Sequence, residues 1–485
     1  MTLPLLLVAL PLALAAAAFA VPSERVRPWL VPAGGAAHLA LTVAVLATPA
    51  RPAAGAWLQL DAVGRLVLAL VSVLFFLCAL YTPGYLAQRA SHSNRTFCAC
   101  LLAFLSMASL IVASHHLGLM WVALEASTLT SAPLLYFNRN PRSLEATWKY
   151  LLIGSVGIAL ALLGTFFLAY AALKVGLAPS LLFEDLVRDA PRLSPPWLHA
   201  AFVVLFVGYG TKMGLAPMHT WKPDAYGEAP GLVGTLLAGA ATNCAFLAIV
   251  RFFQICSAAG EADFARPLLV AMGLVSMVVA GIFMVRQRDY KRMLAYSSVE
   301  HMGILVLGLG LGGAAVFGAM LHLINNGLTK GTLFLSAGNI HRAFGSKSTD
   351  EVSGALRVVP ASATLLLLGF LAATGSPPFG PFVSELTILV AALEAGRWGV
   401  AALFLLVLLV VFVGMGATVL AVVQGEPPAR AAAGAPAAGT PGRESWQTVA
   451  PVAAFMVLVT VMGTWIPGPV RDLVIEAARL VELRP

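Results

Sequence analysis

Long apolar segments are the feature of this sequence that most constrains its fold. A helix of about 20 apolar residues can cross the roughly 30 Å hydrocarbon core of a bilayer. Of the 485 residues, 59% are hydrophobic and only 11% are charged, whereas a soluble domain has about 25% charged residues. The sequence therefore predicts an all-α, polytopic transmembrane helical bundle. About fourteen segments are long enough to span, near residues 3–21, 29–48, 62–81, 97–114, 117–137, 148–172, 197–218, 230–253, 267–285, 296–312, 314–337, 358–394, 399–423 and 448–466.

Basic residues are unevenly distributed between the predicted loops. The loops after odd-numbered segments contain most of them, including the cluster Arg286–Arg292, and the loops after even-numbered segments contain far fewer. Because Lys and Arg are retained on the cytoplasmic side, both termini are predicted to face outward, into the periplasm if the membrane is a bacterial inner membrane. The formal net charge of +8 is interpreted as a sign of orientation and not of nucleic-acid binding.

The cysteine and histidine patterns predict no cofactor. The five cysteines lie in or beside apolar segments and have no CxxC spacing, so no disulfide framework or iron–sulfur cluster is expected. His115 and His116 are adjacent and therefore point in different directions on a helix, and no His/Cys/Asp set has the spacing of metal ligands. We expect no metal site and no redox centre in this chain.

The stretch Gly208–Pro230, GYGTKMGLAPMHTWKPDAYGEAP, predicts a membrane helix that breaks. Gly214 and Pro217 interrupt its apolar pattern, and Pro217 cannot donate a backbone hydrogen bond. Lys212 lies just before the break. An ammonium at that depth costs about 2.5–3.5 kcal/mol unless it faces a polar partner or water, which makes Lys212 a functional candidate. The alternative is a lysine near a helix end that extends to the interface.

A second interruption is predicted at Gly375–Pro381, GSPPFGP, which contains Pro377 and Pro378 and is followed by Glu385. Paired interruptions at corresponding positions indicate an inverted repeat in transporters, although two unrelated kinks are the alternative. We therefore predict two five-helix repeats, each containing one broken helix.

The predicted division is three N-terminal helices in 1–96, repeats in 97–253 and 254–423, a flexible cytoplasmic linker in 424–447, and a last helix with an amphipathic tail in 448–485. The tail is predicted to lie along the membrane surface or against a partner.

Glu125 lies near the middle of an apolar segment, in LMWVALEAST. A carboxylate at that depth is either protonated or paired. A pair with Lys212 would satisfy both charges and let each change protonation when the other moves. A static ion pair that fixes helix packing is the alternative, but buried ion pairs contribute little to stability.

In the second half, His322 and Lys330 are eight residues apart in LHLINNGLTK, so they lie on roughly one helix face. Asn325 and Asn326 extend this polar stripe, which could hold a file of waters between titratable side chains. A histidine that only packs in the core is the alternative. Lys149, His219, Glu300 and His301 lie nearer the predicted helix ends, where a solvated or capping role is expected. His219 is still predicted as a proton-translocation residue, because it could connect the stripe to one aqueous face. The secondary candidates are Lys149, Asn243, His301 and Asn326.

At these residues the sequence resembles the antiporter-like membrane subunits of complex I, of membrane-bound hydrogenases and of Mrp sodium/proton antiporters. The resemblance spans about residues 115–385. It is carried by the helices of Glu125, Lys212 and His322, by RDYKRMLAYSSVEHMG and by GSPPFGPFVSE. The segment GTKMGLAPMHTWKPDA and the short C-terminus are most similar to component F of hydrogenase-4 and formate hydrogenlyase-type complexes.

The resemblance implies a proton channel of two half-channels. Glu125 and Lys212 would form the coupled pair of the first, and Lys330 and Glu385 would hold the central and exit positions, with His322 on the connecting water file. Two departures matter. Asn243 stands where several relatives have a connecting lysine, and Asn326 where many have a second histidine. Since Asn cannot take and release a proton, the connection must use water or His322.

The sequence thus predicts a proton-conducting, non-catalytic subunit of a redox-driven complex, with no cofactor of its own. Its predicted partners are other membrane subunits and, through them, peripheral NiFe-hydrogenase and iron–sulfur subunits of a hydrogenase-4-type complex. The alternatives are a complex I subunit, an Mrp-type or stand-alone cation/proton antiporter, and an inactive membrane scaffold. Whether Na⁺ replaces H⁺ is left open.

Overall fold

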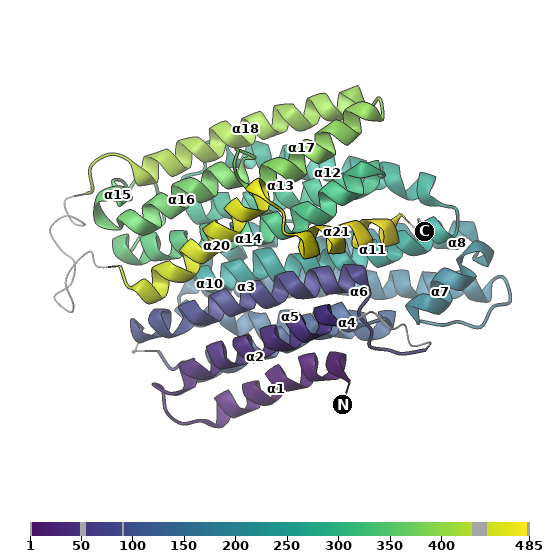
Figure 1. Cartoon of the computed structure of the whole chain (residues 1–485), viewed down its shortest axis with the longest axis horizontal. Coiled ribbons are helices and arrows are strands. Elements are labelled where there is room, and N and C mark those ends of the chain that lie inside the picture. Colours follow the sequence, from purple (N-terminus) through teal and green to yellow (C-terminus); the bar gives the residue numbers. More distant parts are fainter. Residues whose placement is uncertain (1, 49–54, 90–91, 429–443, 483–485) are drawn as a thin grey trace.

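The computed structural model describes residues 2–48, 55–89, 92–428 and 444–482. Its described regular elements are helices, apart from three isolated bridge pairs, and they run broadly side by side (Figure 1). The predicted all-α membrane bundle is therefore confirmed. Ten helices in the described ranges are long and apolar enough to cross a membrane: α1 (Leu3–Ala20), α2 (Arg27–Ala47), α3 (Ala62–Ala87), α4 (Arg95–Ala113), α6 (Pro141–Leu173), the run from α10 to α11 (Gly231–Ala258), α12 (Ala262–Met284), α13 (Tyr290–Leu311), α18 (Trp398–Val423) and α20 (Trp446–Thr464).

Four of the less apolar helices carry the side chains singled out by the sequence. They are α5 (Leu117–Leu135) with Glu125, α8 (Pro195–Met213) with Lys212, α14 (Ala314–Phe344) with His322 and Lys330, and α17 (Gly380–Glu394) with Glu385. Their polar residues lower the hydropathy that identifies a membrane span. Apolar length alone therefore does not establish the predicted count of about fourteen.

After α1, α2 and α3, the element order falls into two sets of five. The first set is α4, α5, α6, the interrupted helix α8 with α9 (Trp221–Glu228), and the run α10 to α11 through the π-helical turn η3 (Leu237–Ala241). The second set is α12, α13, α14, the interrupted helix α16 (Pro360–Ala373) with α17, and α18. The domain bounds and the inverted relation of the two sets stay predictions. Most of the predicted linker, 429–443, lies outside the described residues.

Each interruption has a glycine with a positive φ angle. α8 ends at Met213, and Gly214 takes a φ of 78° while its N–H donates to the carbonyl of Gly210 at 2.8 Å. Helix resumes at Trp221 in α9. α16 ends at Ala373, Gly375 takes a φ of 64°, and helix resumes at Gly380 in α17. Residues with a Cβ rarely adopt this conformation, so both glycines permit the chain to leave its helix.

Close helix contacts in both sets are made at glycine. A Cβ on Gly208 of α8 would lie 2.6 Å from the backbone nitrogen of Ala161 in α6. A Cβ on Gly273 of α12 would lie 2.7 Å from the carbonyl oxygen of Gly303 in α13, and the reverse holds at the same distance. Small residues let membrane helices approach until their backbones touch. The approach of α6 to α8 also brings Gly154 beside Lys212.

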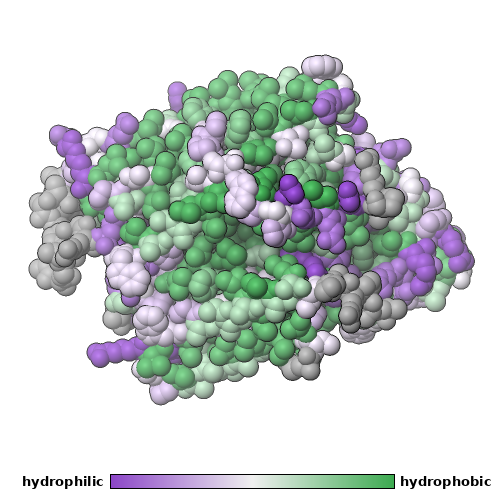
Figure 2. Space-filling view, viewed as in Figure 1, coloured by the Kyte–Doolittle hydropathy of each residue, from purple (hydrophilic) through white to green (hydrophobic). Residues whose placement is uncertain are grey.

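The outer surface is mainly apolar. Hydrophobic residues cover most of the face in Figure 2, and hydrophilic residues gather toward its two ends. Exposed large residues include Trp148, Leu152 and Phe166 on α6 and Leu409 on α18. Such a surface suits lipid or other membrane subunits.

The C-terminal helix α21 (Gly468–Val481) packs against α3 and α14 of the same chain. Val474, Ala477 and Val481 form its buried side. We predicted that this amphipathic tail lies along the membrane surface or against a partner. For its apolar face this prediction is wrong, because that face packs against α3 and α14 of the same chain.

We expect Gly208→Ala to lower the thermal unfolding midpoint of the detergent-solubilised protein. The added methyl would meet the backbone of α6, and overpacking of this kind costs about 1–3 kcal/mol. Gly399→Ala is the matched control, because Gly399 is an exposed position in α18 where a Cβ meets nothing within 4 Å. Equal midpoints for the two variants would contradict the close glycine contact.

Candidate functional site

The first part of the site is an ion pair between two helices. The Nζ of Lys212 lies 3.0 Å from Oε2 of Glu125. It also donates to the hydroxyl of Thr128, and Ser155 donates to the other carboxylate oxygen at 2.8 Å. The Lys212 side chain is 7% exposed and that of Glu125 is 23% exposed. The structure thus joins the two residues that the sequence suggested as a pair, and leaves the carboxylate the more accessible partner.

Local structure explains the position of Lys212. It occupies the last turn of α8, where the helix dipole favours a cation. Across from it, Gly154 of α6 has no side chain, and a Cβ there would lie 3.1 Å from the ammonium. The glycine contact between α6 and α8 therefore leaves room for the lysine to reach Glu125 on α5.

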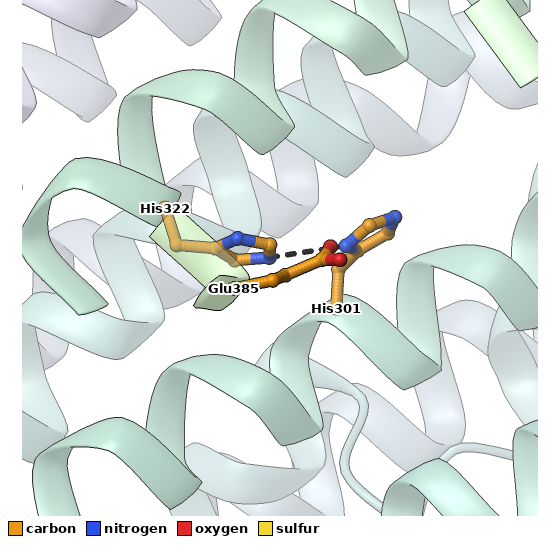
Figure 3. Close-up of side chains that lie close together, drawn as sticks. All are labelled: His301, His322 and Glu385. Atoms are coloured by element: carbon orange, nitrogen blue, oxygen red, sulfur yellow. Dashed lines mark hydrogen bonds between the residues drawn. The ribbon is translucent and has the colours of Figure 1, made fainter. Parts of the chain in front are cut away.

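The second part of the site lies between α13, α14 and α17. His322 of α14 hydrogen-bonds through Nε2 to Nδ1 of His301 at 3.0 Å, and through Nδ1 to the hydroxyl of Ser384 at 3.0 Å. Figure 3 shows the carboxylate of Glu385 beside both imidazole rings. About two helical turns further along α14, Lys330 donates to the hydroxyl of Ser297 at 2.7 Å. These groups, which come from three helices, form one buried polar cluster.

Glu300 and His301 correct the sequence interpretation. Both were expected near a helix end, yet they lie near the middle of α13 and are fully buried. The reason is that α13 begins at Tyr290, where Asp289 caps it by accepting from the N–H groups of Lys291 and Arg292. The capping aspartate in the RDYKR segment was the signal for this earlier start. Glu300 places Oε2 3.6 Å from Nε2 of His301.

Several buried polar atoms of this cluster have no protein partner among the described residues. They include both carboxylate oxygens of Glu300, Oε1 of Glu385, and both amide atoms of Asn326. The amide nitrogen of Asn325 donates to the carbonyl of Gly380 at 2.7 Å, but its Oδ1 also has no hydrogen-bond partner among the described residues. Buried polar groups without protein partners are the usual binding places of internal water.

Three of these residues offer the donor atoms of a metal site. Ligand atoms of His301, His322 and Glu385 all lie within 4.8 Å of one another. The sequence showed no such set, because the three residues are far apart along the chain. The two histidines, however, are hydrogen-bonded directly to each other, and the nearby ammonium of Lys330 would repel a cation. The arrangement fits proton transfer better than metal coordination.

Three other candidates, Lys149, His219 and Asn243, lie outside this cluster. Lys149 is half-exposed and pairs with Glu145 at 2.6 Å and Asp224 at 2.8 Å, as expected for a solvated residue near a helix end. His219 lies in the first interruption, beside the stacked rings of Phe283 and Tyr296.

Asn243 lies on α11, directly after the π-helical turn, and donates back to the carbonyl of Gly239 at 2.5 Å. Neither His219 nor Asn243 is joined by a described hydrogen bond to Lys212 or Lys330. One further lysine, Lys222, was not among the candidates predicted from the sequence, yet it is fully buried.

This architecture, an apolar helical bundle with two interrupted helices and ionisable groups at its centre, defines the chain as an antiporter-like membrane subunit. Its sequence matches the family described as "NADH:quinone oxidoreductase/Mrp antiporter, TM" over residues 114–412. The chain belongs to this family.

Similar proteins come from several kinds of complex. The chain is 37% identical over 345 residues to a hydrogenase-4 component F homolog of Methylacidiphilum infernorum, covering 69% of this chain and 72% of the relative. It is 32% identical over 417 residues to NADH-quinone oxidoreductase subunit N of Desulforudis audaxviator, covering 82% and 81%.

Solved structures show the same fold at low identity. A chain of the Mrp complex from Dietzia sp. superposes with a TM-score of 0.86 at 21% identity, covering 99% of this chain and 97% of that one. A chain of respiratory complex I from Thermus thermophilus superposes with a TM-score of 0.80 at 22% identity, covering 99% of both.

We expect the Glu125–Lys212 contact to show energetic coupling. Glu125→Gln or Lys212→Met alone leaves the other group without its charged partner, which costs about 1–3 kcal/mol. The double variant removes both and should lose less than the sum of the single losses. Thermal unfolding of the four proteins in detergent measures this coupling. Strictly additive losses would show that the two side chains do not interact.

Proposed function

We propose that this chain conducts protons across the membrane as a subunit of a redox-driven complex. The observation that carries the proposal is the series of buried ionisable groups that runs from Glu125 and Lys212 in the first set of helices to Lys330, His322 and Glu385 in the second. Isolated charges inside a membrane are costly, and in membrane proteins they mark ion and proton pathways. A series of them in both sets of helices supports transport rather than a structural role.

The first half would work through its ion pair. Lys212 can hold a proton while Glu125 neutralises its charge, and a cation that approaches the more exposed Glu125 competes for the carboxylate and weakens the pair. Loss of the carboxylate's attraction would favour release of the lysine proton. This links a change at the edge of the subunit to a proton at its centre.

The second half would work through short hydrogen bonds. The series His301, His322 and Ser384 offers contacts of 3.0 Å, and imidazole can accept a proton on one nitrogen and release it from the other. Glu300 and Glu385 lie beside this series. Waters bound to the unpartnered polar atoms would complete the route from Lys330 to the aqueous face.

The similarity to hydrogenase-4 component F favours a hydrogenase-4-type complex as the assembly. Its other membrane subunits would pack against the exposed apolar faces, and peripheral NiFe-hydrogenase and iron–sulfur subunits would supply the redox energy. A complex I subunit would differ in partners and not in mechanism. An Mrp-type antiporter would add Na⁺ as a second ion. The proposed location is a bacterial inner membrane with both termini in the periplasm, as the distribution of basic residues suggests.

We expect Lys212→Met to abolish proton uptake attributable to this subunit. The measurement is acidification of vesicles that contain the purified intact complex, driven by its electron donor, with sodium varied. Methionine keeps the length and apolar stem of lysine but cannot hold a proton. Lys174→Met is the control, because Lys174 is an exposed lysine at the end of α6.

Normal uptake by Lys212→Met would identify the chain as a scaffold or show that protons use another route. Uptake by the wild type that requires sodium would favour the antiporter alternative. Loss in Lys212→Met, without a sodium requirement and with normal uptake by Lys174→Met, is the result expected for a proton channel.

A further inference from the structure

We propose that Lys222 is the proton carrier that connects the two halves of the channel. This inference rests on the proposed function, because it assigns a residue to the step between Lys212 and Lys330. Asn243 cannot serve as that carrier, since an amide does not take and release a proton.

The surroundings of Lys222 are unusual for a lysine. It is fully buried, and its Nζ donates to the carbonyl of Met213 at 2.7 Å and approaches the carbonyl of Ser298 at 3.4 Å. No carboxylate in the described part of the chain lies within ion-pair distance of it. Its cation is therefore held by backbone dipoles, with the ring of Tyr226 5.7 Å away.

The two carbonyls place Lys222 between the halves. Met213 directly follows Lys212 at the end of α8. Ser298 directly follows Ser297, whose hydroxyl accepts from the Nζ of Lys330 at 2.7 Å. The Lys222 ammonium thus contacts the backbone next to each of the two principal lysines. It is also near enough to Lys330 and His301 for their charges to interact with it.

The position of Lys222 requires specific support for its charge. Lys222 is the second residue of α9, and the positive end of a helix dipole disfavours a cation there. The side chain instead reaches back to the end of α8, where carbonyls are unpaired and the dipole is favourable. An apolar residue would fill the same space without the cost of burying a charge.

Gly214 provides the space for this side chain. A Cβ at position 214 would lie 2.6 Å from Cδ of Lys222 and 2.9 Å from its Nζ. The interruption of α8 therefore has two effects. It leaves the carbonyl of Met213 free to accept from Lys222, and the glycine at position 214 leaves space for the Lys222 side chain.

The transfer balances without an oxidant or reductant. A proton leaves the ammonium of Lys212, which becomes an amine, and is taken up by Lys222 as a neutral amine, directly or through a bridging water. Lys222 then returns to the amine when the proton passes to Lys330. Only N–H and O–H bonds form and break. Because the charges of Lys222 and Lys330 interact, a proton arriving at one of them raises the free energy of a proton on the other.

Lys222→Met and Lys222→Arg test this step in vesicles containing the intact complex, with proton uptake measured per donor oxidised. Both variants are expected to lose as much uptake as Lys212→Met. Arginine keeps the charge and can donate to the same carbonyls, but it does not release its proton. The arginine variant therefore separates a proton carrier from a fixed charge.

Lys291→Met is a closely matched control. Lys291 is also buried, is also the second residue of its helix, and donates to the carbonyl of Ala229 at 2.6 Å, at the end of α9. It has no described contact with the polar series, so its variant is expected to pump like the wild type. Thermal unfolding and subunit content of each purified complex show whether the variants assemble.

The outcomes separate the two proposals. Normal uptake by Lys222→Met, with uptake lost in Lys212→Met, would overturn the role of Lys222 and leave the channel in place. Retained uptake in Lys222→Arg would show a fixed positive charge and overturn the carrier role. If Lys222→Met fails to assemble, the arginine variant gives the deciding result. Normal uptake by Lys212→Met would instead reject the proposed function itself.

Discussion

The cost of placing charge inside a membrane is the constraint on which the rest of this structure depends. A buried ion must find an opposite charge, a dipole or a polar group, and this chain uses all three kinds of support. Lys212 has a carboxylate partner in Glu125, Lys222 has the carbonyl of Met213 at a helix end, and Lys330 has the hydroxyl of Ser297. The same helices remain apolar on the outside, where they face lipid or other subunits.

The interruptions and the glycine contacts provide these partners. A continuous α8 would bond its own carbonyls internally and offer none to Lys222. The break at Gly214 releases the carbonyl of Met213. After the second break, Gly380 begins α17, and its carbonyl accepts from Asn325. Close approach at Gly208 and Gly303 then brings the helices that carry the charged groups together. Backbone irregularity is tolerated here because it lies inside the protein.

The sequence was enough to predict the helical bundle and its two interruptions, because hydropathy and proline are local signals. It also reached Glu125, Lys212, His322, Lys330 and Glu385, since an ionisable residue in an apolar run stands out. The prediction placed Glu300 and His301 near a helix end, because the polar RDYKR segment looked like a loop although α13 begins within it. It overlooked Lys222 because the burial of a lysine in the first turn of the short helix α9 depends on tertiary contacts. The hydrogen bond between His301 and His322 joins two helices, and nothing in the spacing along the chain encodes it.

Electrostatics also determine where flux through such a series can be controlled. Passing a proton from one buried lysine to the next leaves the total charge inside the membrane unchanged, whereas taking a proton from water changes it by one. The first and last transfers are therefore the costly ones, since desolvation is incurred there. Glu125 is the partly exposed member of the pair at one end of the series, and charge–charge energies rise steeply as the surroundings become less polar. A charge on a neighbouring subunit would accordingly act most strongly there, through the pair, on the proton held by Lys212.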